Sequence, residues 1–118
     1  MFPSEEAIYD AIKIRYEPLF EDEWLRVAYK LNELSAGLPL ADLESKPIRQ
    51  LTYENIYSIT KDPQVCGLVT DDFELIGLGL ALKFNDPWLC ALLKSYLSGK
   101  FPCAISPVVT TMAKLLGR

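Results

Sequence analysis

The sequence predicts an all-α fold, a compact single domain over residues 1–118 with about five helices around a central helical hairpin at 70–98. The hairpin contains the densest apolar run of the chain, and a short polar break at Asn85-Asp86 divides it into two arms. Apolar residues elsewhere recur at spacings of three and four, the period of a helix. Asp62-Pro63 and Asp86-Pro87 each pair a capping residue with a proline, a combination typical of helix starts.

The first helix is expected to begin after Ser4 and to end before Pro18. Ser4 is a suitable N-cap, and the first turn carries acidic residues, which the positive end of the helix dipole favours. Pro18 ends the helix because the residue before a proline is pushed away from helical geometry. One face of this helix carries four residues at helical spacing: Ile8, Ala11, Ile12 and Arg15.

A second helix, antiparallel to the first, is expected to begin at Glu21-Asp22-Glu23 and to end at Gly37. On its outer face, Asp22 and Arg26 have the i,i+4 spacing of a favourable ion pair. Its buried face is predicted to consist of Trp24, Val27, Ala28, Leu31 and Leu34.

The middle of the chain is less regular. Residues 38–47 are rich in loop-forming types, with one helical turn expected at 41–44. Residues 48–61 suit a helix by their spacing and a strand by the β-branched and aromatic run within 51–60, and we favour the helix. Asp62-Pro63 then starts a short helix that is expected to end near Leu68.

The first arm of the hairpin is predicted as a helix that begins at Thr70. Thr70 serves as the N-cap, and the acidic residues after it lie where a helix N-terminus favours negative charge. Gly77 and Gly79 count against a helix by roughly 1 kcal/mol each, although glycine there lets a neighbouring helix approach closely. The alternative is an α+β fold with a β-hairpin at 64–80.

The second arm has the clearest local signals of the chain. Asp86 is a good N-cap, and Pro87 occupies the first helical position, where its missing N–H costs nothing. Gly99 ends the helix because glycine readily takes the left-handed conformation. Its apolar face consists of Leu89, Leu92, Leu93, Tyr96 and Leu97. After an extended stretch, a last helix is expected to start at Ser106-Pro107.

Composition and charge favour a protein partner. The hydrophobic share is 50% even without glycine, and this surplus over a typical soluble monomer predicts a homodimer or another protein-binding face. The net charge of −4 argues against binding nucleic acid. Side-chain charge is −8 in residues 1–86 and +4 in 87–118. We expect these parts to attract each other, the alternative being that the C-terminal part meets an acidic partner or a membrane surface.

The cysteines and the hydropathy pattern predict a cytoplasmic protein. The three cysteines, Cys66, Cys90 and Cys103, are an odd number without a C-x-x-C motif, which suits a reducing compartment. Residues 1–15 are amphipathic and acidic, unlike a signal peptide. The chain contains no run of about 18 apolar residues, so no membrane span is expected.

Several catalytic chemistries are disfavoured by the residue types present. The chain has no histidine, which removes the usual general base, the usual triads and most zinc sites. Gly77-Leu78-Gly79 fails the dinucleotide fingerprint because Leu82 occupies the place of the third glycine. No phosphate-binding loop, nucleophile elbow or calcium loop occurs. Cys90 and Cys103 lack an evident base to form a thiolate.

Two acidic clusters remain as candidate sites, at 71–74 and at 17–23. Carboxylates from facing helices can hold Mg²⁺ against a phosphate substrate, provided that the two clusters lie close together. The candidate catalytic residues are then Asp71, Asp72 and Glu74, and the candidate metal ligands are Asp71, Asp72, Glu21 and Asp22. Helix capping explains Asp71 and Asp72 without a metal, and we favour it.

The sequence therefore predicts a small cytoplasmic protein-interaction or regulatory module without catalytic activity or a cofactor. Its partner is a second copy of the chain or another protein. The alternative is a metal-dependent hydrolase that acts on a phosphate compound through the clustered carboxylates.

Overall fold

The computed structural model describes residues 4–36 and 62–117. The loop predicted at 38–47 and the choice between helix and strand at 51–60 fall outside these ranges. The described helices are α1 (Glu5–Arg15), α2 (Pro18–Ser35), α4 (Pro63–Ala81), α5 (Pro87–Leu97) and α6 (Met112–Leu115). The all-α prediction is confirmed. The alternative β-hairpin at 64–80 is wrong, because this whole segment is helical.

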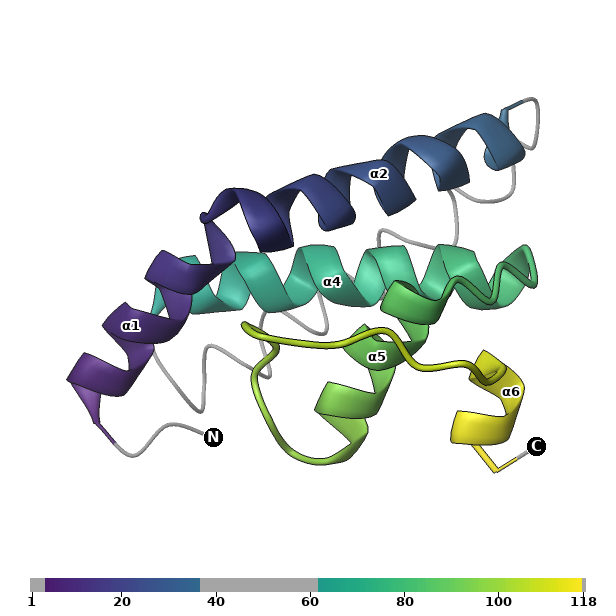
Figure 1. Cartoon of the computed structure of the whole chain (residues 1–118). Coiled ribbons are helices and arrows are strands. Elements are labelled where there is room, and N and C mark those ends of the chain that lie inside the picture. Colours follow the sequence, from purple (N-terminus) through teal and green to yellow (C-terminus); the bar gives the residue numbers. More distant parts are fainter. Residues whose placement is uncertain (1–3, 37–61, 118) are drawn as a thin grey trace.

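The longest helix, α4, lies between α2 and α5 (Figure 1). α5 runs from the end of α4 across its other side, so the predicted central hairpin exists with α4 and α5 as its arms. α6 packs against α5. In the described parts of the chain, no helix has the length and apolar character that crossing a bilayer requires.

The first two helices differ from the prediction in their arrangement. α1 and α2 continue in roughly the same direction with a bend between them, and they do not form an antiparallel pair (Figure 1). Only Tyr16 and Glu17 connect them, and Tyr16 keeps helical dihedral angles, φ −91° and ψ 0°. Pro18 both stops α1 and occupies the first position of α2. The second helix therefore starts three residues before the predicted Glu21 and brings Phe20 into the core.

The first arm of the hairpin is longer than predicted. α4 runs without interruption from Pro63, capped by Asp62, so the short helix ending near Leu68 and the helix beginning at Thr70 are one element. Thr70 is not a cap: its hydroxyl donates to the carbonyl of Cys66 one turn earlier, at 2.7 Å. A threonine bonded in this way satisfies its hydroxyl inside a helix and does not end it. Asp71 and Asp72 consequently lie in the middle of a helix, and their interpretation as capping residues is wrong.

The signals of the second arm are confirmed. Asp86 caps α5 by accepting from the backbone N–H groups of Trp88 and Leu89, at 2.9 and 3.2 Å. Gly99 follows the helix with φ +74°, the left-handed conformation expected there. The last helix is wrongly predicted: α6 begins at Met112, with Thr111 as its cap, and not at Ser106-Pro107. The β-branched run from Val108 to Thr111 disfavours a helix directly after the proline.

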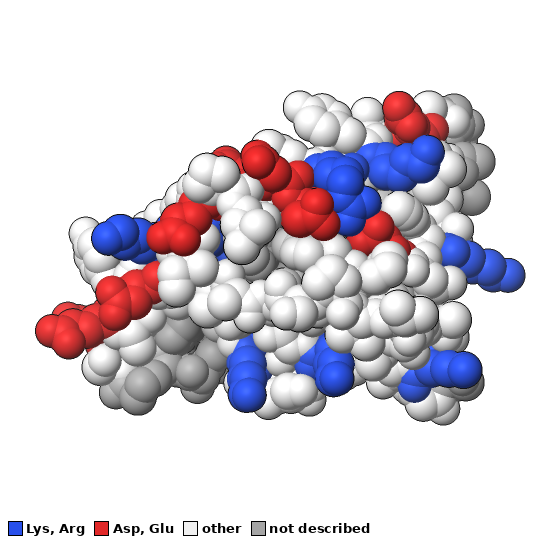
Figure 2. Space-filling view, viewed as in Figure 1, with Lys and Arg blue, Asp and Glu red and all other residues white. Residues whose placement is uncertain are grey.

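Charged side chains are divided between two sides of the molecule. Figure 2 shows acidic side chains, with some basic ones among them, along α1 and α2, and basic side chains along the opposite edge over α5 and α6. Between residues 87 and 117 the charged side chains are Lys94, Lys100 and Lys114, all exposed. The side of the molecule formed by α1 and α2 is therefore its acidic side.

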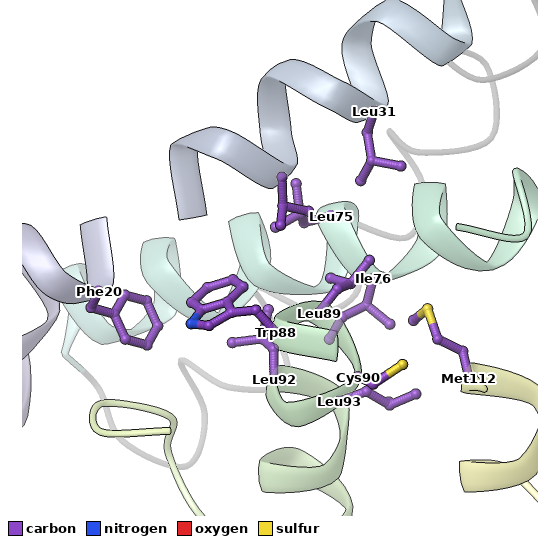
Figure 3. Close-up of a cluster of buried hydrophobic side chains, with 11 residues drawn as sticks. Phe20, Leu31, Leu75, Ile76, Trp88, Leu89, Cys90, Leu92, Leu93 and Met112 are labelled. Carbon is purple, nitrogen blue, oxygen red and sulfur yellow. The ribbon is translucent and has the colours of Figure 1, made fainter. Parts of the chain in front are cut away.

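The main core is formed between α2, α4, α5 and α6 (Figure 3). α4 and α5 approach closely at Gly79, where an added Cβ atom would come within 2.5 Å of a methyl carbon of Leu89. This confirms the packing reason expected for Gly79 but not for Gly77, which is exposed and faces open space. A second, smaller cluster joins α1 to α4 and the segment after α5: Ala11, Val65, Val69 and Phe101.

Candidate functional site

A buried ion pair links α1 to α4. Arg15 donates from its two terminal nitrogens to the two carboxylate oxygens of Asp72, at 2.8 and 2.7 Å. The two side chains keep only 4% and 0% of their surface exposed. The guanidinium also lies over the ring of Phe20, 4.3 Å from its centroid. A pair with two parallel hydrogen bonds fixes the orientation of both groups as well as their distance.

Side chains of two more helices donate hydrogen bonds to the Asp72 carboxylate. Trp24 of α2 donates its indole N–H to Asp72 at 2.9 Å, and Tyr96 of α5 donates its hydroxyl at 2.5 Å. Arg15 in turn donates to the carbonyl of Pro102 at 3.3 Å. Burial and the negative charge of Asp72 raise the pKa of Tyr96, which keeps its hydroxyl protonated as a donor. This Asp72 network (Arg15, Trp24, Asp72, Tyr96) thus holds four helices together at one point.

The carboxylates considered for a metal site are mostly separated by the fold. Both oxygens of Asp72 are occupied by the donors of the network. Asp22 is exposed on α2, and Glu74 lies one helical turn beyond Asp71 on α4. Among the described residues, no three acidic, cysteine or histidine side chains gather in the way that a metal ion requires.

Two of the predicted residues line the same pocket, which lies between α1, α2 and α4. Glu21 lies on the α2 side and Asp71 on the α4 side of this pocket, whose volume is about 250 Å³. Most of the other side chains that line the pocket are aromatic or aliphatic. These six other residues are Arg15, Tyr16, Phe20, Trp24, Leu25 and Leu68. The Asp72 network borders the pocket, because Arg15 and Trp24 belong to both.

The exposed apolar side chains of the described residues concentrate on α1 and α2. Six of the eight large ones belong to these helices or to the bend between them, and the other two are Leu97 and Val109. The six are Tyr9, Tyr16, Leu19, Leu25, Tyr29 and Leu34. Exposed tyrosine and leucine side chains are typical of protein-binding faces, where aromatic anchors contribute much of the affinity.

A stripe on α2 extends from the pocket. Glu21, Leu25 and Tyr29 are spaced by four residues, which places them one above another on the same face of the helix. Tyr29 is 69% exposed and Leu25 39% exposed. The pocket and this stripe together form one continuous surface, which we call the α2 face (the pocket lining with Glu21, Leu25 and Tyr29). It combines apolar area with acidic charge.

The sequence interpretation missed the Asp72 network although a signal for it existed. Arg15 shares its predicted face with apolar residues, and Asp72 lies in an arm that is apolar nearly all round. A charged residue on an apolar face is buried only when it is paired, so Arg15 and Asp72 were each a sign that a partner exists. The pairing itself joins residues 57 positions apart and follows only from the fold.

Comparison with known proteins identifies one family. The model of the family described as "Immunity protein PIM1" matches residues 1–103. The matched part contains α1, α2, α4 and α5, and with them the complete Asp72 network and the α2 face. No curated protein and no solved structure shows a significant match to the chain.

Proposed function

Because this chain belongs to the immunity protein PIM1 family, we propose that it binds a protein toxin and protects the cell from it. The family match over residues 1–103 is the observation that carries this proposal. In this role the chain acts in the cytoplasm through its binding surface, with no catalytic step of its own. Inhibition then results from covering or distorting the toxin, which needs a stable complex and no reactive group.

The described surface supports a binding role. Exposed tyrosine and leucine side chains gather on α1 and α2, and the same helices carry most of the exposed carboxylates of the described residues. Such a combination suits association with another protein, since apolar contacts supply affinity and charge supplies selectivity.

The test begins with capture of the partner. The full-length chain is immobilised, proteins retained from an extract of the native cell are identified, and each is then expressed alone and together with the chain. We expect one retained protein to arrest growth when expressed alone and to be tolerated when the chain is co-expressed. The two should also elute as one complex in size-exclusion chromatography. If none of the retained proteins is toxic, the immunity role is wrong.

The alternative of a metal-dependent hydrolase stays a prediction and gains no support from the geometry. Both oxygens of Asp72 are occupied by other donors, and no group of three possible metal ligands occurs among the described residues. Thermal unfolding with millimolar Mg²⁺ or Mn²⁺ tests it, because a specifically bound ion must stabilise the folded chain. A rise in melting temperature with either ion would revive this alternative.

A further inference from the structure

We propose that the α2 face is the centre of the toxin-binding surface and that its pocket receives an arginine side chain from a basic face of the toxin. This inference rests on the proposed function and adds to it the site and the chemistry of the partner. Three properties of the pocket support it: its size, its walls and its charge.

The size of the pocket suits one side chain. Its volume of about 250 Å³ lies below the roughly 300–1,000 Å³ usual for sites that enclose a small molecule or cofactor. Pockets that accept a single anchoring side chain are typical of the central part of a protein interface. The exposed stripe that continues from it supplies the surrounding contact area through Leu25 and Tyr29.

The walls of the pocket suit a flat cation. Tyr16 and Trp24 provide aromatic rings, and Trp24 is held in place by its hydrogen bond to Asp72. A guanidinium stacks on such rings and forms paired hydrogen bonds with a carboxylate. Glu21, exposed at this pocket, is the carboxylate that we assign to this contact.

The charge of the pocket favours a cation despite the presence of Arg15. The guanidinium of Arg15 is neutralised by its two hydrogen bonds to Asp72. Glu21 then leaves an exposed acidic group at the pocket. The surrounding helices are also acidic, since residues 4–36 hold eight acidic and four basic side chains. A basic partner is therefore attracted before contact and stabilised after it.

The first experiment needs no toxin. The indole N–H resonance of Trp24 is followed by NMR while the full-length chain is titrated with N-acetyl-arginine amide, and then with the neutral analogue N-acetyl-citrulline amide. We expect a saturable shift with the arginine compound and a much smaller one with citrulline. Equal responses to both, or none, would overturn the assignment of the pocket to a cationic side chain. A saturable shift with Mg²⁺ but not with arginine would do the same, in favour of a metal.

The second experiment uses the captured toxin and five variants, of which two are controls. Glu21→Lys, Leu25→Ala and Tyr29→Ala are each expected to weaken binding at least tenfold. Leu97→Ala is the matched control, since Leu97 is 53% exposed but lies on α5, outside the face formed by α1 and α2. Glu33→Lys is the matched charge control, because it makes the same change in charge about 18 Å along the helix from Glu21. Both controls should stay within about threefold of the unaltered chain.

The outcomes of the second experiment separate the two proposals. A toxin that binds all the variants like the unaltered chain confirms the immunity role and overturns the α2 face as its site. Equal losses for Glu21→Lys and Glu33→Lys would show general charge attraction without a pocket. If Leu25→Ala and Tyr29→Ala instead dissociate a dimer of the free chain, the face is a self-association surface and this inference is wrong.

Discussion

At the scale of single residues, Asp72 shows how a buried charge is made acceptable. Its carboxylate has lost all contact with water, which is costly for a charge in a low-dielectric interior. Two hydrogen bonds from Arg15 and one each from Trp24 and Tyr96 replace the lost hydration. No buried polar side-chain atom of the described residues lacks a hydrogen-bond partner. The hydrogen bonding of the Asp72 network is therefore complete. A substitution that removes one of the two charged partners leaves the other charge buried without compensation.

Asp72→Asn is predicted to destabilise the fold severely. The substitution leaves the buried Arg15 guanidinium uncompensated, for which a loss of about 3–5 kcal/mol in the free energy of unfolding is expected. Urea denaturation followed by circular dichroism measures this loss. The double variant Arg15→Met with Asp72→Leu removes both charges and should recover much of the stability. A single variant as stable as the unaltered chain would show that the pair has no structural role.

Gly79 and Gly77 form a natural matched pair on α4. Gly79→Ala is expected to lower the free energy of unfolding by about 1–2 kcal/mol, because its methyl group would collide with the buried Leu89. Gly77→Ala, which faces open space, should raise stability by up to about 1 kcal/mol through helix propensity. Thermal and urea unfolding of both variants tests this. Equal effects at the two positions would contradict the close approach of α5.

At the scale of elements, the two helix starts in which an aspartate precedes a proline were correctly predicted, at Asp62 and Asp86. Both signals act within one turn and need no distant contact. Thr70 and Ser106 also resemble caps, yet neither starts a helix. The hydroxyl of Thr70 donates to a backbone carbonyl inside α4. The residues after Ser106 do not sustain a helix. A capping residue is thus a reliable signal only when the neighbouring residues agree with it.

Asp86 joins two elements, because it caps α5 and accepts two hydrogen bonds from Arg26 of α2, at 2.8 and 3.0 Å. Burial alone would raise the pKa of Asp86, but the hydrogen bonds from Arg26 and from the backbone of Leu89 and Trp88 hold it below its usual 3.8. In the unfolded chain this carboxyl takes up a proton more readily. The folded state therefore loses stability as the pH falls through the lowered pKa of Asp86.

Asp86→Asn isolates this contribution, since asparagine also caps helices but carries no charge. Urea unfolding is compared at about pH 5 and about pH 3, where protonation of Asp86 weakens the unaltered chain. We expect the variant to be less stable than the unaltered chain at the higher pH and to lose less on acidification. The same loss in both proteins would mean that other carboxyl groups determine the acid sensitivity.

At the scale of the whole molecule, the surplus of apolar residues is reflected in the face formed by α1 and α2. The homodimer expected from composition stays a prediction, and its alternative is that this face serves the toxin alone. Static light scattering of the purified chain at high concentration distinguishes the two. A dimer mass is expected if the composition argument holds, and a monomer mass would assign the apolar face to a different protein.

The sequence by itself determined the helical character of the chain and the two best helix starts, and its composition predicted a protein partner. These follow from capping, spacing and composition, which act locally or on average. The tertiary structure decided that α4 is continuous, that Arg15 meets Asp72, and that Glu21 and Asp71 share a pocket. The last two of these join residues far apart in the chain. Their distance depends on how whole helices pack, and no local pattern records it.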